Sequence, residues 1–307
     1  AAVARLAERE RVIGLLGLLG QAEAIEAASA AQARGVPMLT LSQTAAITDI
    51  GDEVFRNALT PAMQVEALVT HARQEFGYRR FAVLYPDDPY GREMKDRFEE
   101  AVRRQGGTVV VARGYARGQT DFRNEIRVIS GLPEQRDTEV EGAPDVGRPE
   151  RVGFEALFLP DGAGTVSLIA AQLSFYDVTG VTLLGTPAWN RPELLRNDPE
   201  GLEGAVFVDE YDAGSRLPEV NDFTDRFYAA YGREPDGVEA LAFDGAAILF
   251  KVILDGAPES RRQFRDRLQA VKDYPGVTGR TTFLPNREAA KRVLLFGVRN
   301  GRIVRLR

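Results

Sequence analysis

The sequence predicts an α/β protein whose parallel sheets are covered by helices on both faces. Short β-rich runs alternate with amphipathic helical segments along nearly the whole chain, and repeated strand–helix–strand units produce parallel sheets. The 307 residues, of which 44% are apolar and 27% charged, are enough for two such lobes with substantial cores. Ligands of these sheets bind beyond the carboxyl ends of the strands, so the loops that follow the strands are the first candidates for a site.

Periodicity predicts alternating helices and strands in the first 130 residues or so. The helix at 62–76 carries Val65, Leu68 and Val69 on one apolar face, and Gly77 ends it because glycine readily adopts the left-handed conformation found at helix ends. The predicted helices of this part are residues 1–11, 21–34, 62–76, 91–105 and 121–129. The predicted strands are residues 12–16, 37–41, 54–58, 81–85 and 108–112.

The second part begins with a polar segment, residues 133–152, that has three prolines and no periodicity, which predicts an exposed loop. The pattern then resumes with strands at 156–159, 181–184 and 205–208, the first two joined by a helix. Helices near 219–231, 238–255 and 260–272 follow, with no strand predicted between them. A hairpin of residues 293–298 and 303–306 ends the pattern, and its Asn300-Gly301 pair is typical of a type I′ turn.

Composition and motifs exclude several classes of function. The net charge is −6 without a basic cluster, which argues against a nucleic-acid partner, and no run of 18 apolar residues could span a membrane. Cysteine is absent, so disulfides, thiolate zinc sites and cysteine nucleophiles are excluded. No phosphate-binding loop or metal-binding motif occurs, so no cofactor or metal is predicted.

Enzyme signatures are equally scarce, so we predict that the protein is not an enzyme. The only histidine, His71, lies inside an amphipathic helix, and no G-x-S-x-G motif is available to pair with it. A hydrolase using the adjacent acids Asp87 and Asp88 is the remaining catalytic option. Adjacent carboxylates in a loop are more often a helix cap and a solvated neighbour.

Two loops in the first part of the chain contain donors that suit a carboxylate. Three glycines spaced three apart precede the helix that opens at Gln21 and Ala22, where free N–H groups could meet an anion, although a tight turn alone explains the glycines. Ser42 and Thr44 follow the strand at 37–41. They are either cap and turn residues or hydrogen-bond donors to a ligand.

Four later residues are also candidates for ligand binding, each beside a structural alternative. Tyr90, at the mouth of the strand at 81–85, suits a ligand wall because its ring is apolar and its tip is polar. Asp161 follows the strand at 156–159 and opens a helix. Trp189, the single tryptophan, is either core or site, and Glu210 is either solvated or in contact with a ligand ammonium group.

These loops, in this order, resemble the type I periplasmic binding proteins of the Leu/Ile/Val-binding class over nearly the full length. The stretch from Phe154 to Trp189 is also similar to a subgroup, the lipoproteins that activate penicillin-binding proteins. The matching pieces are Val12-Ile13-Gly14, Gly35 to Leu39 with Ser42 and Thr44, Val54-Phe55-Arg56, Phe81 to Gly91, Thr120-Asp121-Phe122, Leu184-Gly185, Glu203-Gly204, and Gly276 to Gly279 with Thr281 and Phe283.

The resemblance implies two Rossmann-like lobes with parallel sheets, joined by three crossovers and closing on a ligand in the cleft between them. Lobe one would comprise residues 1–60 and 211–290, and lobe two 61–210 and 291–307. The resemblance also implies that lobe one lacks its N-terminal strands and that natural sequence precedes Ala1. The strand at 12–16 would then be an exposed apolar edge.

The same resemblance assigns site residues. It places a ligand carboxylate at Gln21-Ala22 and at Ser42 with Thr44, and it matches Tyr90 to the family's tyrosine. Pro187 stands where the family has its ammonium-binding glutamate, and our hypothesis is that Asp161 or Glu210 replaces that acid.

The implied function is an extracytoplasmic binding protein that serves an ABC transporter, with a small polar, carboxylate-bearing ligand and a membrane permease as partners. The alternative is a ligand-independent lipoprotein domain that activates a cell-wall synthase. In either case the chain itself does not insert into a membrane, and a lipid anchor would lie on a missing N-terminal segment.

Overall fold

The computed structural model describes residues 2–132 and 152–306, which form two compact units. Unit 1 consists of Ala1–Thr60 and Glu210–Val293, and unit 2 of Pro61–Asp209 and Leu294–Arg307. The chain therefore crosses from one unit to the other three times. Compared with the lobes expected from the sequence, unit 1 also contains Glu210 and residues 291–293, and Glu210 forms an ion pair with Lys291 inside this unit.

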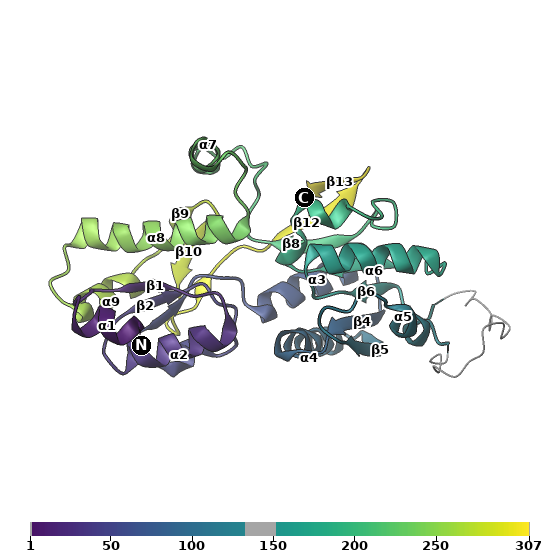
Figure 1. Cartoon of the computed structure of the whole chain (residues 1–307), viewed down its shortest axis with the longest axis horizontal. Helices are drawn as coiled ribbons and strands as arrows, with labels where there is room; N and C mark the ends of the chain where they lie inside the picture. Colours follow the sequence, from purple (N-terminus) through teal and green to yellow (C-terminus); the bar gives the residue numbers. More distant parts are fainter. Residues whose placement is uncertain (1, 133–151, 307) are drawn as a thin grey trace. The chain divides into compact units, whose positions relative to one another are not determined.

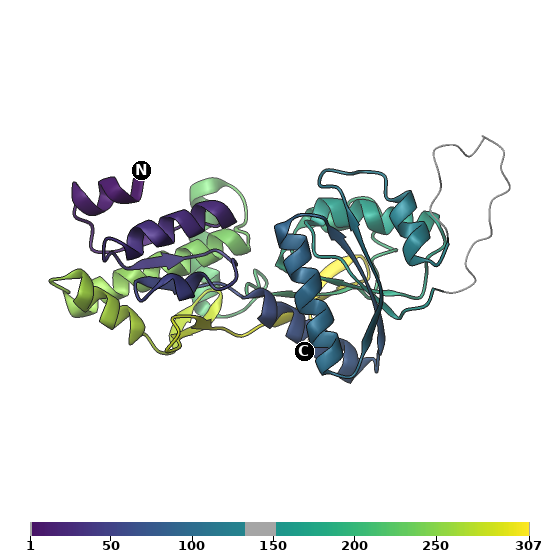
Figure 2. The ribbon, with the colours of Figure 1, turned by 90° about the horizontal axis from the view of Figure 1, so that it is seen from below.

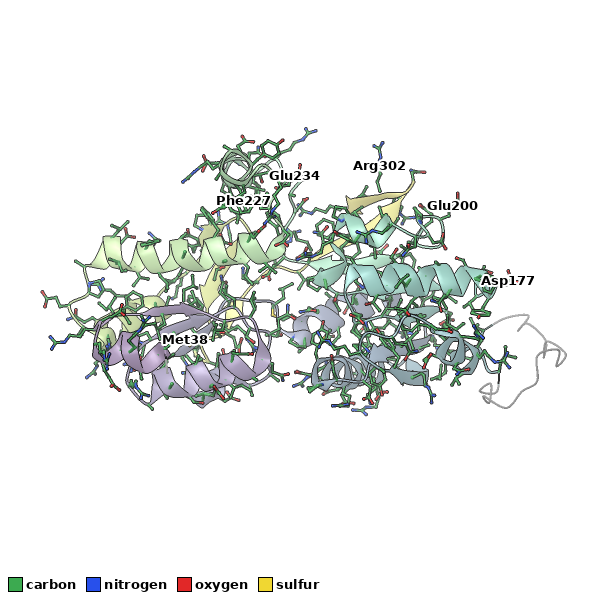
Figure 3. All side chains as sticks on the ribbon, in the orientation of Figure 1. Met38, Asp177, Glu200, Phe227, Glu234 and Arg302 are labelled. Carbon is green, nitrogen blue, oxygen red and sulfur yellow. The ribbon has the colours of Figure 1, made fainter. Side chains whose placement is uncertain are left out.

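The main sheet of unit 1 is small and parallel. Its strands are β1 (Leu15–Gly17), β2 (Met38–Thr40) and β3 (Val54–Arg56), with β2 in the middle. Helix α2 (Gln21–Gln32) covers one face, and helices α8 (Gly237–Gly256) and α9 (Arg261–Gln269) cover the other (Figure 1). Buried alanines of α2 pack against Met38, which lies in the interior of the unit (Figure 3), whereas Ile248 of α8 packs against Leu39 and Phe55.

The remaining elements of unit 1 include helices α1 (Ala2–Glu8) and α7 (Pro218–Tyr231), from which Phe227 projects (Figure 3), and the 3₁₀ turn Ile47–Ile50. Residues 273–292, for which periodicity predicts no element, contain β9 (Tyr274–Gly276), β10 (Gly279–Phe283) and β11 (Ala289–Ala290), an antiparallel set. These strands have two to five residues, too few for a clear alternation. They are held by packing, because Phe283 meets Phe55 edge to face with ring centroids 5.5 Å apart.

Unit 2 contains a seven-stranded sheet in the order β13-β12-β8-β7-β6-β4-β5 within the described part of the chain. The strands from β8 to β5 run parallel, and the hairpin β12–β13 joins antiparallel to β8, as the sequence predicted for a hairpin with an Asn-Gly turn. Asn300 and Gly301 both have positive φ (51° and 66°), as a type I′ turn requires. The strand bounds are β4 Arg80–Pro86, β5 Thr108–Tyr115, β6 Ala156–Phe158, β7 Thr182–Gly185, β8 Val206–Asp209, β12 Leu294–Arg299 and β13 Arg302–Arg305.

Helices cover both faces of this sheet, as the fold class requires (Figure 2). Helices α3 (Pro61–Glu75) and α4 (Pro89–Arg104) lie on one face, where Phe98 of α4 stacks on Phe158 of β6 with centroids 4.4 Å apart. Helices α5 (Arg123–Ile129) and α6 (Ala163–Phe175) lie on the other, over the core that contains Trp189. The short 3₁₀ turns Pro187–Trp189 and Pro192–Leu195 complete the unit.

Several element boundaries differ from those predicted. Strand β1 begins at Leu15 rather than residue 12, α1 ends at Glu8 rather than residue 11, and β5 continues to Tyr115 rather than residue 112. The loop predicted at 133–152 lies outside the described residues, apart from Val152. Among residues 2–132 and 152–306, no helix combines the length and the apolar character needed to cross a membrane.

Candidate functional site

Two buried hydroxyl groups lie at the carboxyl end of β2 in unit 1. Ser42 is 1% exposed and Thr44 8% exposed, and their hydroxyl oxygens are 2.8 Å apart. The backbone N–H of Thr44 donates to Ser42 Oγ at 3.3 Å. One hydroxyl proton lies between the two side chains, and the second hydroxyl proton has no acceptor among the described residues.

A buried ion pair holds this loop in place. Arg56, at the end of β3, donates to both carboxylate oxygens of Glu288 at 2.6 Å and, through Nη1, to the carbonyl oxygen of Thr44 at 2.5 Å. Arg56 is only 4% exposed, so the planar guanidinium fixes the Thr44 backbone with little freedom.

The predicted residues Gln21 and Ala22 are the first two residues of α2, and both are exposed. Their helix begins after Gly20, which has extended dihedrals and makes no side-chain cap, so the first N–H groups of α2 have no capping side chain. Thr40 Oγ1 donates to the carbonyl oxygen of Leu18 at 3.2 Å and so links the end of β2 to the segment that leads into α2. The two predicted carboxylate-binding loops therefore start from neighbouring strands of one sheet.

A second polar cluster lies at the carboxyl ends of β4 to β7 in unit 2. The hydroxyl of Tyr115, the last residue of β5, donates to Asp161 Oδ2 at 2.6 Å, and the backbone N–H of Gly162 donates to Asp161 Oδ1 at 2.6 Å. Burial, followed by the hydrogen bond to Asp161, raises the pKa of Tyr115. The phenol is therefore a permanent donor, and both Asp161 oxygens already accept one hydrogen bond.

Tyr90 belongs to the same cluster. Burial is the main reason why the pKa of Tyr90 is raised to about 12, and the nearby Asp161, Asp88 and Glu93 carboxylates act in the same direction. The Thr186 hydroxyl beside Tyr90 lowers this pKa, but the contact falls short of regular hydrogen-bond geometry. Thr186 is 0% exposed, and its hydroxyl has no hydrogen-bond partner in the part of the chain that the structure describes. Tyr90 and Thr186 thus place two polar groups together at this edge.

The two remaining predicted site residues are engaged within their own units. Trp189 is 0% exposed, donates from Nε1 to the carbonyl oxygen of Leu159 at 3.1 Å, and packs in the core of unit 2, so it offers no surface to a ligand. Glu210 is 6% exposed and lies 3.5 Å from Lys291 Nζ. A protein ammonium group therefore occupies the position in which a ligand ammonium was expected.

The acids considered for hydrolysis have structural partners. Asp88 is the N-cap of α4, where Oδ1 accepts from the backbone N–H of Gly91 at 2.8 Å, and Asp87 pairs with Arg92 at 2.6 Å. His71 is half-buried against Phe76, and burial lowers its pKa. No group of three or more His, Asp or Glu side chains within residues 2–132 and 152–306 could hold a metal ion.

Sequence reasoning missed Tyr115 and Thr186 of the second cluster, and also the buried residues Asp244, Lys291, Arg56 and Glu288 of unit 1. Tyr115 would follow from extending the alternation of the strand at 108–112, and Thr186 stands directly after a predicted strand. Asp244, an acid in the middle of an apolar helix, is itself a signal of a buried polar contact. Lys291 pairs with Glu210, and Arg56 pairs with Glu288, and spacing cannot show partners that lie so far apart in the sequence.

Comparisons with known proteins match this architecture. The family profile described as periplasmic binding protein matches residues 1–302. A leucine-binding protein, LivK from Thermotoga maritima, superposes with a TM-score of 0.81 at 22% identity, over 100% of this chain and 82% of its own. LivJ from Streptococcus pneumoniae in complex with isoleucine gives 0.78 at 18% identity, over 99% and 83%.

A solute-binding protein from R. palustris in complex with benzoate gives a TM-score of 0.78 at 17% identity, over 99% of this chain and 79% of its own. The corresponding comparison with curated proteins yields no significant match. At these identities the structural likeness concerns the fold.

Proposed function

Because the chain belongs to the periplasmic binding protein family, we propose that it is an extracytoplasmic solute-binding protein that delivers a small, carboxylate-bearing ligand to an ABC transporter. The observation that carries this proposal is the Ser42–Thr44 pair, which keeps one hydroxyl proton available at the end of β2. A hydroxyl that donates to a carboxylate forms a charge-assisted hydrogen bond, stronger than a neutral one. The ligands named for compared structures, isoleucine, leucine, benzoate and 4-hydroxybenzoate, all carry a carboxylate.

An ammonium group on the ligand would need a carboxylate acceptor as well. Glu210 faces Lys291, so we no longer assign it this role. Asp161 accepts one hydrogen bond on each oxygen, and each oxygen still has a second lone pair. We therefore keep Asp161 as the proposed acceptor, with the Tyr90 hydroxyl as a further polar contact and with the N–H groups at Gln21 and Ala22 beside the carboxylate.

Calorimetric titration of the purified chain with leucine, isoleucine, benzoate and 4-hydroxybenzoate tests the carboxylate assignment. Leucinamide and benzamide, which have an uncharged amide in place of the carboxylate, are the matched control ligands. The Ser42→Ala/Thr44→Val variant is expected to bind the carboxylates about 10- to 100-fold more weakly, because a hydrogen bond to a charged group contributes roughly 1.5–3 kcal/mol. Ser29→Ala, an exposed hydroxyl deletion on α2, serves as the control variant.

The role of Asp161 is tested by comparing two ligand types in one variant. Asp161→Asn should weaken leucine binding and leave benzoate binding unchanged, since only leucine has an ammonium group. Equal losses for both ligands would show that Asp161 acts through the fold rather than through the ammonium group.

Closure of the two units on the ligand is part of the same proposal, and small-angle scattering with and without a bound ligand tests it. If no compound of the panel and no co-purified molecule in native mass spectrometry binds, the ligand-independent alternative, activation of a cell-wall synthase, is the better account.

A further inference from the structure

A buried charge cluster inside unit 1 joins residues from all three crossover segments. The chain leaves or re-enters this unit at Thr60, Glu210 and Val293. The Glu210 carboxylate accepts a hydrogen bond from the backbone N–H of Leu59, on the first crossover. It also pairs with Lys291 Nζ at 3.5 Å, on the third crossover. The Glu210 side chain, on the second crossover, therefore contacts both the first and the third crossover segments.

The cluster is anchored to the core of unit 1 through α8. Lys291 Nζ donates to Thr278 Oγ1 at 2.5 Å, and Thr278 Oγ1 donates to Asp244 Oδ2 at 2.5 Å. The Asp244 carboxylate also accepts from the backbone N–H groups of Val277 and Thr278 at 2.8 Å each. Asp244 is 0% exposed and stands in the middle of α8, so the chain of contacts ends in a rigid element.

Backbone spacing supports this arrangement. A Cβ atom on Gly276 would lie 2.4 Å from Asp244 Oδ2, so only glycine leaves room for the carboxylate at this point. The Lys291 side chain is 0% exposed and that of Glu210 6%, so water does not replace the contacts between them. Burial raises the pKa of Glu210, while Lys291 and the Leu59 N–H oppose this shift. Such a pair is costly to bury and is therefore weak evidence for stability by itself.

We infer that Glu210 is a positioning residue that clasps the three crossovers together at the boundary of unit 1, so that they can bend only beyond Leu59, Glu210 and Lys291. The functional part of this inference rests on the proposed function, because bending of the crossovers would accompany ligand binding. The clasp itself is a property of the ligand-free protein and can be measured without any ligand.

Amide hydrogen exchange of the ligand-free chain tests the clasp directly. In Glu210→Leu/Lys291→Met both charges are removed together, so no unpaired charge remains buried. The Leu59 amide, which loses its acceptor, should exchange about five- to tenfold faster, and the Thr278 amide should stay protected by Asp244. In Glu210→Gln/Lys291→Met the glutamine oxygen can still accept from Leu59, so protection there should return close to the wild-type value.

Two results of the exchange experiment would overturn the inference. One is equal Leu59 protection in both double variants. The other is a uniform rise in exchange across unit 1, which would indicate general destabilisation. Lys251→Met/Asp255→Leu, which removes an exposed ion pair from α8, is the control and should leave Leu59 unchanged.

The consequence for the crossovers is tested by single-molecule energy transfer. The chain has no cysteine, so Glu26→Cys in unit 1 and Arg103→Cys in unit 2, both exposed, can be labelled without competing thiols. The transfer distribution of the ligand-free protein should broaden in Glu210→Leu/Lys291→Met and not in Glu210→Gln/Lys291→Met. Unchanged width in both variants would refute the clasp. If no ligand of the panel changes the transfer distribution of the wild-type protein, ligand-linked closure is refuted. The inference about the clasp is not affected by that result.

Discussion

Individual polar side chains in this protein have partners that are far apart in the sequence. Arg56 meets Glu288, Glu210 meets Lys291, and Tyr115 meets Asp161. Local sequence placed Ser42, Thr44 and Tyr90 at strand ends, because the rule for parallel sheets needs only the end of a strand. It could not show that the Glu210 carboxylate would pair with Lys291, which lies 81 residues later in the chain.

Tyr90 gives a prediction about pH. Its pKa in the folded chain is about 12, against 10.0 for the ordinary phenol, and burial is the main cause. Between pH 10 and 12 the folded state keeps a proton that the unfolded state releases, so the free energy of unfolding must fall as the pH rises. Tyr90→Phe should reduce this fall in urea denaturation at pH 10, 11 and 12. Tyr228→Phe, which changes an exposed tyrosine of α7, is the control. An equal effect of both variants would contradict the attribution of the pH dependence to Tyr90.

Gly185, at the end of β7, gives a prediction about packing. A Cβ atom there would lie 2.1 Å from Cδ2 of the buried Trp189 ring, which cannot move without disturbing the core. Gly185→Ala should lower the free energy of unfolding by about 1–3 kcal/mol in urea denaturation. Gly164→Ala is the matched control, because a Cβ atom at this position of α6 would meet no other atom within 4 Å. This variant should leave the free energy of unfolding unchanged or raise it by roughly 0.5–1 kcal/mol.

At the scale of elements, the sequence predicts the regular part of the fold better than the irregular part. Strand–helix alternation located the strands of the large sheet and the helices on both of its faces, because most of its strands lie next to helices whose apolar face repeats over several turns. The three-residue β1 was displaced, and the set β9–β11 was missed, because these strands have two to five residues each and no helix separates β9, β10 and β11. Their positions come from contacts such as Phe55 with Phe283, which lie far apart in the chain.

Strand β1 gives a prediction about association. It pairs with β2 alone among the described strands, and the leucines on and after it are exposed: Leu16 39%, Leu18 45% and Leu19 49%. An open apolar edge favours pairing between chains, and a charge on it opposes such pairing. Leu18→Lys should therefore reduce light scattering during heating. Tyr231→Lys adds the same charge on an exposed helical residue of α7, and an equal reduction there would show that the edge is not responsible.

At the scale of the whole molecule, each unit is assembled from two separate pieces of chain. Unit 2 needs residues 61–209 and 294–307, because β12 covers the edge of β8. The rings of Phe207 on β8 and Phe296 on β12 stack with centroids 5.5 Å apart. The division into two units therefore does not follow the order of the sequence.

This division predicts how fragments of unit 2 behave. A fragment of residues 61–209 should fold less stably and bind a hydrophobic dye, because β8 and Phe207 lose their cover. The same fragment joined to residues 294–307 by a glycine–serine linker should recover a cooperative urea transition. Equal stability of the two fragments would show that β12 and β13 are dispensable.

The β8–β12 pairing also bears on how this chain forms while it is being synthesised. All of residues 210–293 must leave the ribosome after β8 and before the strand that completes its sheet. During that interval the edge of β8 that β12 later covers stays open on the nascent chain. The late return of β12 thus keeps unit 2 incomplete until residues 294–299 have been synthesised.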